Sequence, residues 1–149
     1  MTSFTDLAVL LSFGNDDRAL ARSARRGVFQ PVIPRQLDGV KAYRRLSFAD
    51  EDVRLLVLIR DLNRLMAGGV NGDAPITARR ELYDLARGVD DGFVSWSLEW
   101  SSRFGWLTIG SDVFTEEMPT VSAPTLVLPL GVDLHGEWAA AYEAANAAR

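Results

Sequence analysis

Three arginines recur at helical spacing early in the chain, and their chemistry is that of anion binding. Arg18, Arg22 and Arg25 stand at positions i, i+4 and i+7, so an α-helix would carry all three guanidinium groups on one side. Leu20 and Ala24 fall on the other side, where such a helix would pack against a core. A guanidinium can donate two parallel hydrogen bonds to a phosphate or to the edge of a guanine. The pattern therefore predicts a helix that contacts a nucleic acid.

The charge around these arginines is strongly positive in a protein whose overall charge is −4. Between residues 18 and 45 the only acidic side chain is that of Asp38. The basic residues of this segment are Arg18, Arg22, Arg25, Arg26, Arg35, Lys41, Arg44 and Arg45. Residues 67–149 carry five basic and twelve acidic side chains and would repel nucleic acid. We therefore expect a polyanion to bind the basic segment, and the acidic second half is open to a protein partner.

Residues suited to catalysis or to metal binding are scarce. The chain has no cysteine and a single histidine, His135, which excludes disulfides, a cysteine nucleophile and a histidine-rich metal site. No Ser-His-Asp arrangement, phosphate-binding loop or dinucleotide-binding motif is present. We therefore expect no enzyme, no cofactor and no metal.

The second half offers a different kind of site. It holds four tryptophans, Trp96, Trp100, Trp106 and Trp138. They could line a ligand pocket or form the core of a small sheet, and both interpretations stay open. The acidic pairs Asp90-Asp91 and Glu116-Glu117 fall in turn-like places and are interpreted as solubilising loops.

The elements that would position the basic residues can be read from periodicity and breakers. Residues 1–88 predict a helix capped by Thr5, a turn, a helix over 18–26 that ends at Gly27, a two-stranded wing, and two further helices over about 50–66 and 76–87. The wing strands are placed around Val32-Ile33 and Ala42-Tyr43, with Pro34 and Gly39 between them. The wide apolar surface of the 50–66 helix implies burial on more than one side, or a homodimer contact through residues 55–66.

The second half has a different residue pattern, which predicts strands followed by one helix. Residues 94–100 alternate apolar and polar side chains, which predicts a half-buried strand that turns into a second strand at 104–109. Residues 121–130 carry two prolines, which indicates an edge strand. An alanine-rich helix over 136–147 would stack Trp138 on Tyr142. The expected class is α+β, with a domain over 1–88 and a small β-rich region over 89–149 packed on or beside it.

Two runs of residues carry a resemblance to a known family. Arg25-Arg26-Gly27-Val28-Phe29-Gln30-Pro31 has the basic pair, glycine, two apolar residues and proline that end the recognition helix of MerR-type domains. Tyr43-Arg44-Arg45-Leu46-Ser47, followed by the acidic and apolar residues 50–56, is similar to the end of that family's wing and its next helix. Residues 4–87 thus resemble the winged helix-turn-helix DNA-binding domain of MerR-type transcription regulators.

The resemblance and the charge pattern together predict a sequence-specific protein that binds double-stranded DNA in the cytoplasm, either a transcription regulator or an accessory factor of recombination or of a phage. Arg18, Arg22, Arg25 and Arg26 would contact the groove, and Lys41, Arg44 and Arg45 would hold the DNA backbone. Tyr43 could be a contact or could pack the wing. No sustained heptads follow Gly88, so the family's long dimer helix is not expected, and a homodimer would use the 55–66 helix or the second half.

Two alternatives belong to other classes. Ala21-Arg22-Ser23 stands where the family has an arginine and two aromatic residues, and the second half is acidic and rich in tryptophan. Both features favour a protein–protein interaction module, such as a phage-type inhibitor or adaptor, that keeps the winged-helix fold. The second alternative is a small-molecule sensor that binds its ligand through the tryptophans. Neither a signal peptide nor an apolar run long enough to cross a membrane is recognised, so no membrane partner is expected.

Overall fold

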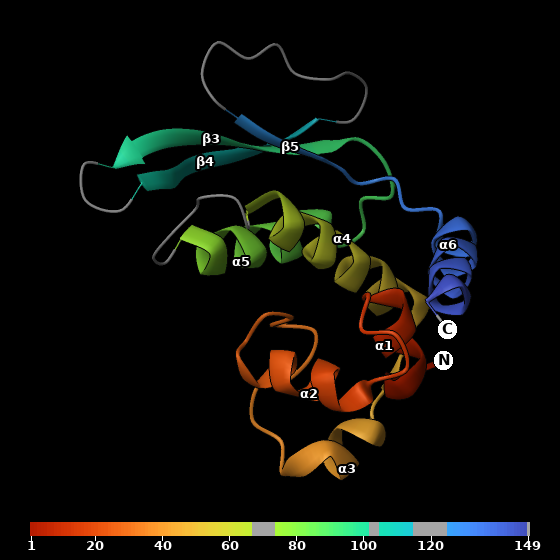
Figure 1. The fold of residues 1–149 in the computed structure, drawn as a ribbon. Coiled ribbons are helices and arrows are strands. Elements are labelled where there is room, and N and C mark those ends of the chain that lie inside the picture. Colours follow the sequence, from red (N-terminus) through yellow and green to blue (C-terminus); the bar gives the residue numbers. More distant parts are fainter. Residues whose placement is uncertain (67–73, 102–104, 115–124, 149) are drawn as a thin grey trace. The chain divides into compact units, whose positions relative to one another are not determined.

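The computed structural model of the protein describes residues 1–66, 74–101, 105–114 and 125–148 (Figure 1). The chain folds into two compact units. The first unit comprises Met1–Val57 together with Asp133–Arg149, and the second comprises Leu58–Val132. The sequence predicts a boundary near residues 88–92, whereas the division falls inside a long helix and again ahead of the last helix. The two ends of the chain therefore fold together, a contact that composition alone does not reveal.

The described residues form six helices and two small antiparallel sheets, which confirms the α+β class. The elements of the first unit are β1 (Thr2–Ser3), α1 (Phe4–Leu10), α2 (Asp17–Arg25), α3 (Gly39–Arg44), β2 (Ser47–Phe48), the start of α4 (Asp50–Met66) and α6 (Leu134–Ala147). β1 pairs antiparallel with β2, which joins the start of the chain to the entry of α4. α6 lies beside α1 (Figure 1).

Local signals set the ends of the first two helices. Ser3 caps α1, because its hydroxyl accepts a hydrogen bond from the Asp6 amide at 3.1 Å, so the predicted cap at Thr5 is wrong. Asp16 caps α2 by accepting from the Ala19 amide at 3.0 Å. Gly27 follows α2 with a φ of +79°, a conformation that favours glycine and ends the helix where the sequence predicts it.

The predicted two-stranded wing is wrong. Residues 26–38 form turns and an irregular loop, and residues 39–44 form the helix α3 where the second wing strand was expected. Ile33 and Tyr43, one from each predicted strand, are both fully buried in the core. A short apolar pair between breakers cannot distinguish a strand from a turn or a helix that carries one residue inward. Among residues 1–66 the only strands are β1, which precedes α1, and β2, which follows α3, so no strand lies between α2 and α3.

The core of the first unit joins the four N-terminal helices. Its largest buried side chains are Phe4, Leu7, Leu10, Leu20, Ile33, Tyr43, Leu55 and Leu56. The rings of Phe4 and Tyr43 lie 5.3 Å apart between centroids, which couples α1 to α3. The α4 helix is buried on several sides, as its wide apolar surface predicts, since every residue from Val53 to Arg60 is buried. In α6, the rings of Trp138 and Tyr142 stack at 5.8 Å, as predicted.

The second unit places α5 (Ala74–Ala86) against a three-stranded sheet of β3 (Phe93–Ser101), β4 (Gly105–Phe114) and β5 (Thr125–Pro129). The strand order is β4-β3-β5 and both pairings are antiparallel, so β5 is an edge strand as its prolines predict. Phe93 pairs with Phe114, and the register shifts between Ser97 and Leu98. The side chains of Trp96, Trp100 and Trp106, and the pair Glu116-Glu117, lie outside the described residues, so the proposed pocket and the loop interpretation of that pair stay predictions.

Candidate nucleic-acid interface

The α2 helix separates its apolar and cationic residues onto different sides. Leu20, Ala21 and Ala24 are buried, whereas the arginines are exposed. The exposed arginines of α2 and its C-cap are Arg18, Arg22, Arg25 and Arg26. Because successive residues are rotated by about 100° in an α-helix, the first three form one stripe, as the sequence predicts. The packing of Leu20 and Ala24 fixes the direction in which that stripe points.

The C-terminal end of α2 is held by the turns that follow it. Arg35 Nε donates a hydrogen bond of 3.0 Å to the Arg25 carbonyl, and Arg25 Nη2 donates to the Leu37 carbonyl at 3.4 Å. A cation at this end also matches the partial negative charge of the helix C-terminus. Arg25 is therefore partly engaged with the protein itself. Arg35 was counted among the basic residues but was not predicted as part of the site.

The α3 helix carries a second pair of exposed cations. Lys41 and Arg45 are exposed and four residues apart, so they share one side of α3. Tyr43 falls on the other side and is fully buried. Its hydroxyl lies 2.8 Å from the Pro34 carbonyl oxygen and 3.0 Å from that of Arg35, and can donate to either. Tyr43 thus anchors α3 to the preceding turns, and its ring and hydroxyl are not on the surface that a ligand would meet.

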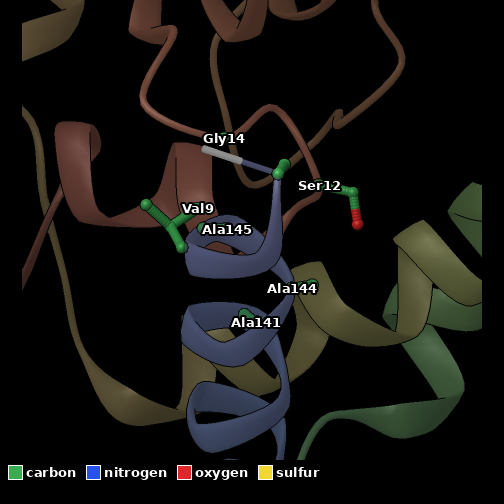
Figure 2. Close-up of a pocket in the computed structure, with 7 residues that line it drawn as sticks. Val9, Ser12, Gly14, Ala141, Ala144 and Ala145 are labelled. Atoms are coloured by element: carbon green, nitrogen blue, oxygen red, sulfur yellow. The ribbon is translucent and has the colours of Figure 1, made fainter.

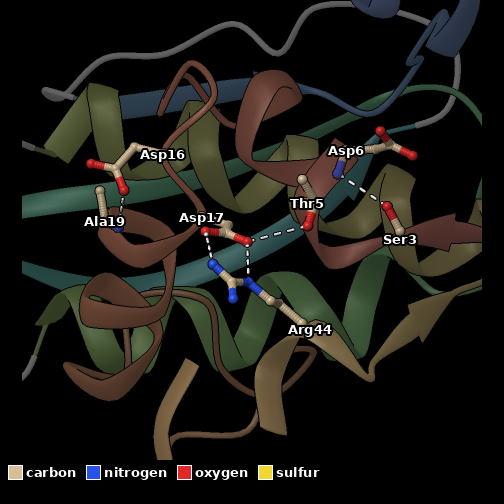
Figure 3. Close-up of polar contacts among 7 residues, drawn as sticks. All are labelled: Ser3, Thr5, Asp6, Asp16, Asp17, Ala19 and Arg44. Carbon is tan, nitrogen blue, oxygen red and sulfur yellow. Dashed lines mark hydrogen bonds and ion pairs between the residues drawn. The ribbon is translucent and has the colours of Figure 1, made fainter. Parts of the chain in front are cut away.

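Arg44 is engaged in an ion pair with the first residue of α2 (Figure 3). Arg44 Nε lies 2.6 Å from Asp17 Oδ2, and Arg44 Nη2 lies 3.1 Å from Asp17 Oδ1. Thr5 adds a third hydrogen bond, from its hydroxyl to Asp17 Oδ2 at 3.2 Å. The Arg44 hydrogen bonds hold the pKa of the Asp17 carboxyl below its usual range although burial opposes this. The same contact raises the pKa of Arg44.

The structure therefore sorts the predicted contact residues into two groups. Among the predicted contact residues, five are exposed and form no hydrogen bond or ion pair within the described part of the chain: Arg18, Arg22, Arg26, Lys41 and Arg45. We call these five the cationic surface. Arg25 and Arg44 are bonded within the protein, and Tyr43 is buried. α2 and α3 contact each other, so both parts of this surface belong to the first unit.

Sequence reasoning missed Thr5 and Asp17 as partners of a predicted contact residue. The adjacent pair Asp16-Asp17 offers a weak signal, because a helix start needs one capping carboxylate and a second one is left for another role. Asp17 and Arg44 are 27 positions apart, however, and local spacing does not connect them.

Other features of the first unit are less suited to a charged ligand. A hollow of about 250 Å³ lies between the turn after α1 and the end of α6 (Figure 2). It is lined by Val9, Ser12, Gly14, Ala141, Ala144, Ala145 and Ala148. His135 is exposed on α6. Within the part of the chain that the structure describes, no group of three histidine or carboxylate side chains could hold a metal ion, and no helix is long and apolar enough to cross a membrane.

Comparison of the chain with protein-family models, with curated proteins and with solved structures found no match in any of the three.

Proposed function

We propose that the protein binds double-stranded DNA in a sequence-specific manner, as a transcription regulator or as an accessory factor of recombination. In this proposal α1 and α2 form a helix-turn-helix, α2 is the recognition helix, and α3 stands where a wing was expected. One observation carries it. α2 buries Leu20 and Ala24. Arg18 and Arg22 on α2 and Arg26 at its C-cap are exposed, and none of the three forms an ion pair among the described residues.

The dimensions of α2 suit the major groove. Its nine residues make a helix about 13 Å long, at roughly 1.5 Å per residue. An α-helix with its side chains is about 10–12 Å across, and the major groove is about 12 Å wide. Arginines on the exposed side could therefore reach base edges, while Lys41 and Arg45 on α3 would contact phosphates.

The cationic surface sets the expected salt dependence. Each phosphate neutralised contributes about −0.9 to the slope of log K against log salt concentration. Five contacts would give a slope of about −4.5, so a fourfold rise in salt would weaken binding roughly 500-fold. Binding by an uncharged surface would change little over the same range.

A pair of matched variants tests the proposal. Arg22→Ala removes one charge from the exposed side of α2, and Arg80→Ala removes one from the exposed side of α5 in the second unit. We expect Arg22→Ala to weaken binding to duplex DNA about tenfold, as loss of one arginine contact does, and Arg80→Ala to leave it unchanged. Fluorescence anisotropy with labelled duplexes measures both, and selection from a random duplex pool identifies the preferred site.

Equal affinities of the two variants would contradict the placement of the interface on α2. A parent protein that binds no duplex at low salt, or that enriches no site, would contradict sequence-specific DNA binding. Those outcomes would favour the protein–protein interaction module instead, and affinity purification resistant to nuclease would then search for its partner.

A further inference from the structure

The carboxylate of Asp17 joins three helices of the first unit. Asp17 is the first residue of α2, Thr5 lies in the first turn of α1, and Arg44 is the last residue of α3. All three side chains meet at the two oxygens of Asp17, as Figure 3 shows. We call this set the Asp17 clamp.

The geometry of the clamp leaves Arg44 little freedom. Two nitrogens on one edge of its planar guanidinium bind the two oxygens of one carboxylate, so neither end of the pair can swing without breaking both hydrogen bonds. Asp17 is 7% exposed, and a buried carboxylate that loses its partner is strongly disfavoured. Arg44 Nε and Nη2, which could otherwise donate hydrogen bonds to a phosphate, are thus bonded to Asp17.

The clamp lies next to the cationic surface on both helices. Asp17 directly precedes Arg18 on α2, and Arg44 directly precedes Arg45 on α3. Because each helix is a rigid repeat, fixing one residue fixes the rotation of its neighbours around the helix axis. Together with the packing of the buried side of α2, the clamp therefore restrains the direction of the α2 arginines relative to Lys41 and Arg45.

We infer that Asp17 and Arg44 are positioning residues, which hold the two parts of the cationic surface in the arrangement that one DNA site requires without touching DNA themselves. This inference rests on the proposed function. Base recognition depends on the direction of hydrogen bonds, whereas attraction to phosphates tolerates small shifts. Loosening the clamp should therefore lower the preference for the selected site over random duplex and spare the affinity for random duplex.

The test compares Arg44→Gln with Arg45→Gln, which remove the same charge from adjacent residues of α3. Circular dichroism first shows that each protein is folded from about 50 to 200 mM salt. Affinities for the selected site and for a random duplex are then measured over the same range. We expect Arg44→Gln to lower the preference for the selected site over random duplex about tenfold, which is the effect of losing about one base contact. The slope of log K against log salt concentration should stay unchanged. Arg45→Gln should keep the preference and make the slope shallower by about 0.9.

Asp17→Asn removes the negative partner of Arg44 and leaves Arg44 in place, so it distinguishes a positioning role of Arg44 from a direct contact with DNA. If Arg44 were a phosphate contact restrained by Asp17, this variant would free it and strengthen binding to every duplex. The inference instead expects a loss of preference similar to that of Arg44→Gln. The double variant Asp17→Asn/Arg44→Gln, whose amides can pair without charge, should then lose less than the two single losses combined.

Thr5→Val is a milder variant for the case in which the others unfold, because it removes one of the three hydrogen bonds. It should lower the preference in the same direction by a smaller factor. Preferences that stay within twofold of the parent in every folded clamp variant overturn the inference, and so does a shallower salt slope in Arg44→Gln. If the parent binds no duplex, the proposed function fails first, which is a distinct result.

Discussion

The Tyr43→Phe substitution tests whether this residue supports α3 or contacts DNA. The ring is fully buried, and its hydroxyl lies within hydrogen-bond distance of the Pro34 and Arg35 carbonyls. A phenylalanine keeps the ring, including its contact with Phe4 at 5.3 Å between centroids, and removes only the donor. The change in stability therefore isolates the hydroxyl.

The expected magnitude follows from what the hydroxyl does. It has one hydrogen and can satisfy one carbonyl fully, and a typical intramolecular hydrogen bond contributes about 1 kcal/mol net. Both hydrogen bonds are part-buried and Pro34 and Arg35 are exposed residues, so the loss should stay near this value. We expect Tyr43→Phe to lower the free energy of unfolding of the first unit by about 1 kcal/mol, and Tyr43→Ala by about 3–5 kcal/mol because the ring is lost as well.

Urea unfolding followed by far-ultraviolet circular dichroism measures the change, and duplex affinity is measured separately on folded protein. The control is Tyr142→Phe, since Tyr142 is 47% exposed on α6 and should stay within about 0.5 kcal/mol of the parent. Tyr43→Phe should bind duplex DNA as the parent does. A variant with unchanged stability and a tenfold loss of affinity would refute the assignment of Tyr43 to the core.

Three further predictions concern the first unit. Gly27→Ala should lower the free energy of unfolding by about 1 kcal/mol or more, because φ is +79° and the new Cβ would lie 3.3 Å from Gln30 Oε1. Thermal unfolding measures this loss. Gly14→Ala, at φ +61° and with open space around the new Cβ, is the comparison for backbone strain alone. Asp16→Ala should cost about 1 kcal/mol by removing the α2 cap, and an unchanged urea midpoint would contradict the capping role. Asp17 has a lowered pKa, so its ion pair stabilises the fold above the usual value of about 3.9 and this stabilisation is lost as the pH falls through the lower folded pKa. Urea unfolding at several pH values should show a shallower acid decline in Asp17→Asn than in the parent.

Much of the local structure could be predicted because its signals are local. The arginine spacing, with Asp16 or Asp17 as its possible cap and Gly27 at its end, predicts α2, and the apolar pattern predicts α4 up to Met66. Alternation predicts β3, and the i, i+4 spacing of Trp138 and Tyr142 predicts their stacked rings. Each of these signals lies within a few residues of the element that it specifies.

The absence of a wing and the roles of Tyr43 and Arg44 could not be predicted in this way. Ala42-Tyr43 suits a strand or a helix equally well, and the choice depends on how Tyr43 reaches the Pro34 carbonyl and the ring of Phe4. The position of the division between the two units likewise depends on the packing of the chain's two ends. In both cases the deciding contacts join residues that are distant in sequence.

The amino-acid sequence by itself determined the helical stripe of arginines on α2, since periodicity, a capping aspartate and a terminal glycine act within one or two turns. It also determined that positive charge is concentrated between residues 18 and 45. Only the tertiary structure decided which of those cations are available to a ligand. Arg44 is held by Asp17 across 27 residues, Tyr43 is inside the core, and Arg18, Arg22 and Arg26 are exposed, because burial and pairing depend on what the rest of the fold brings to each side chain.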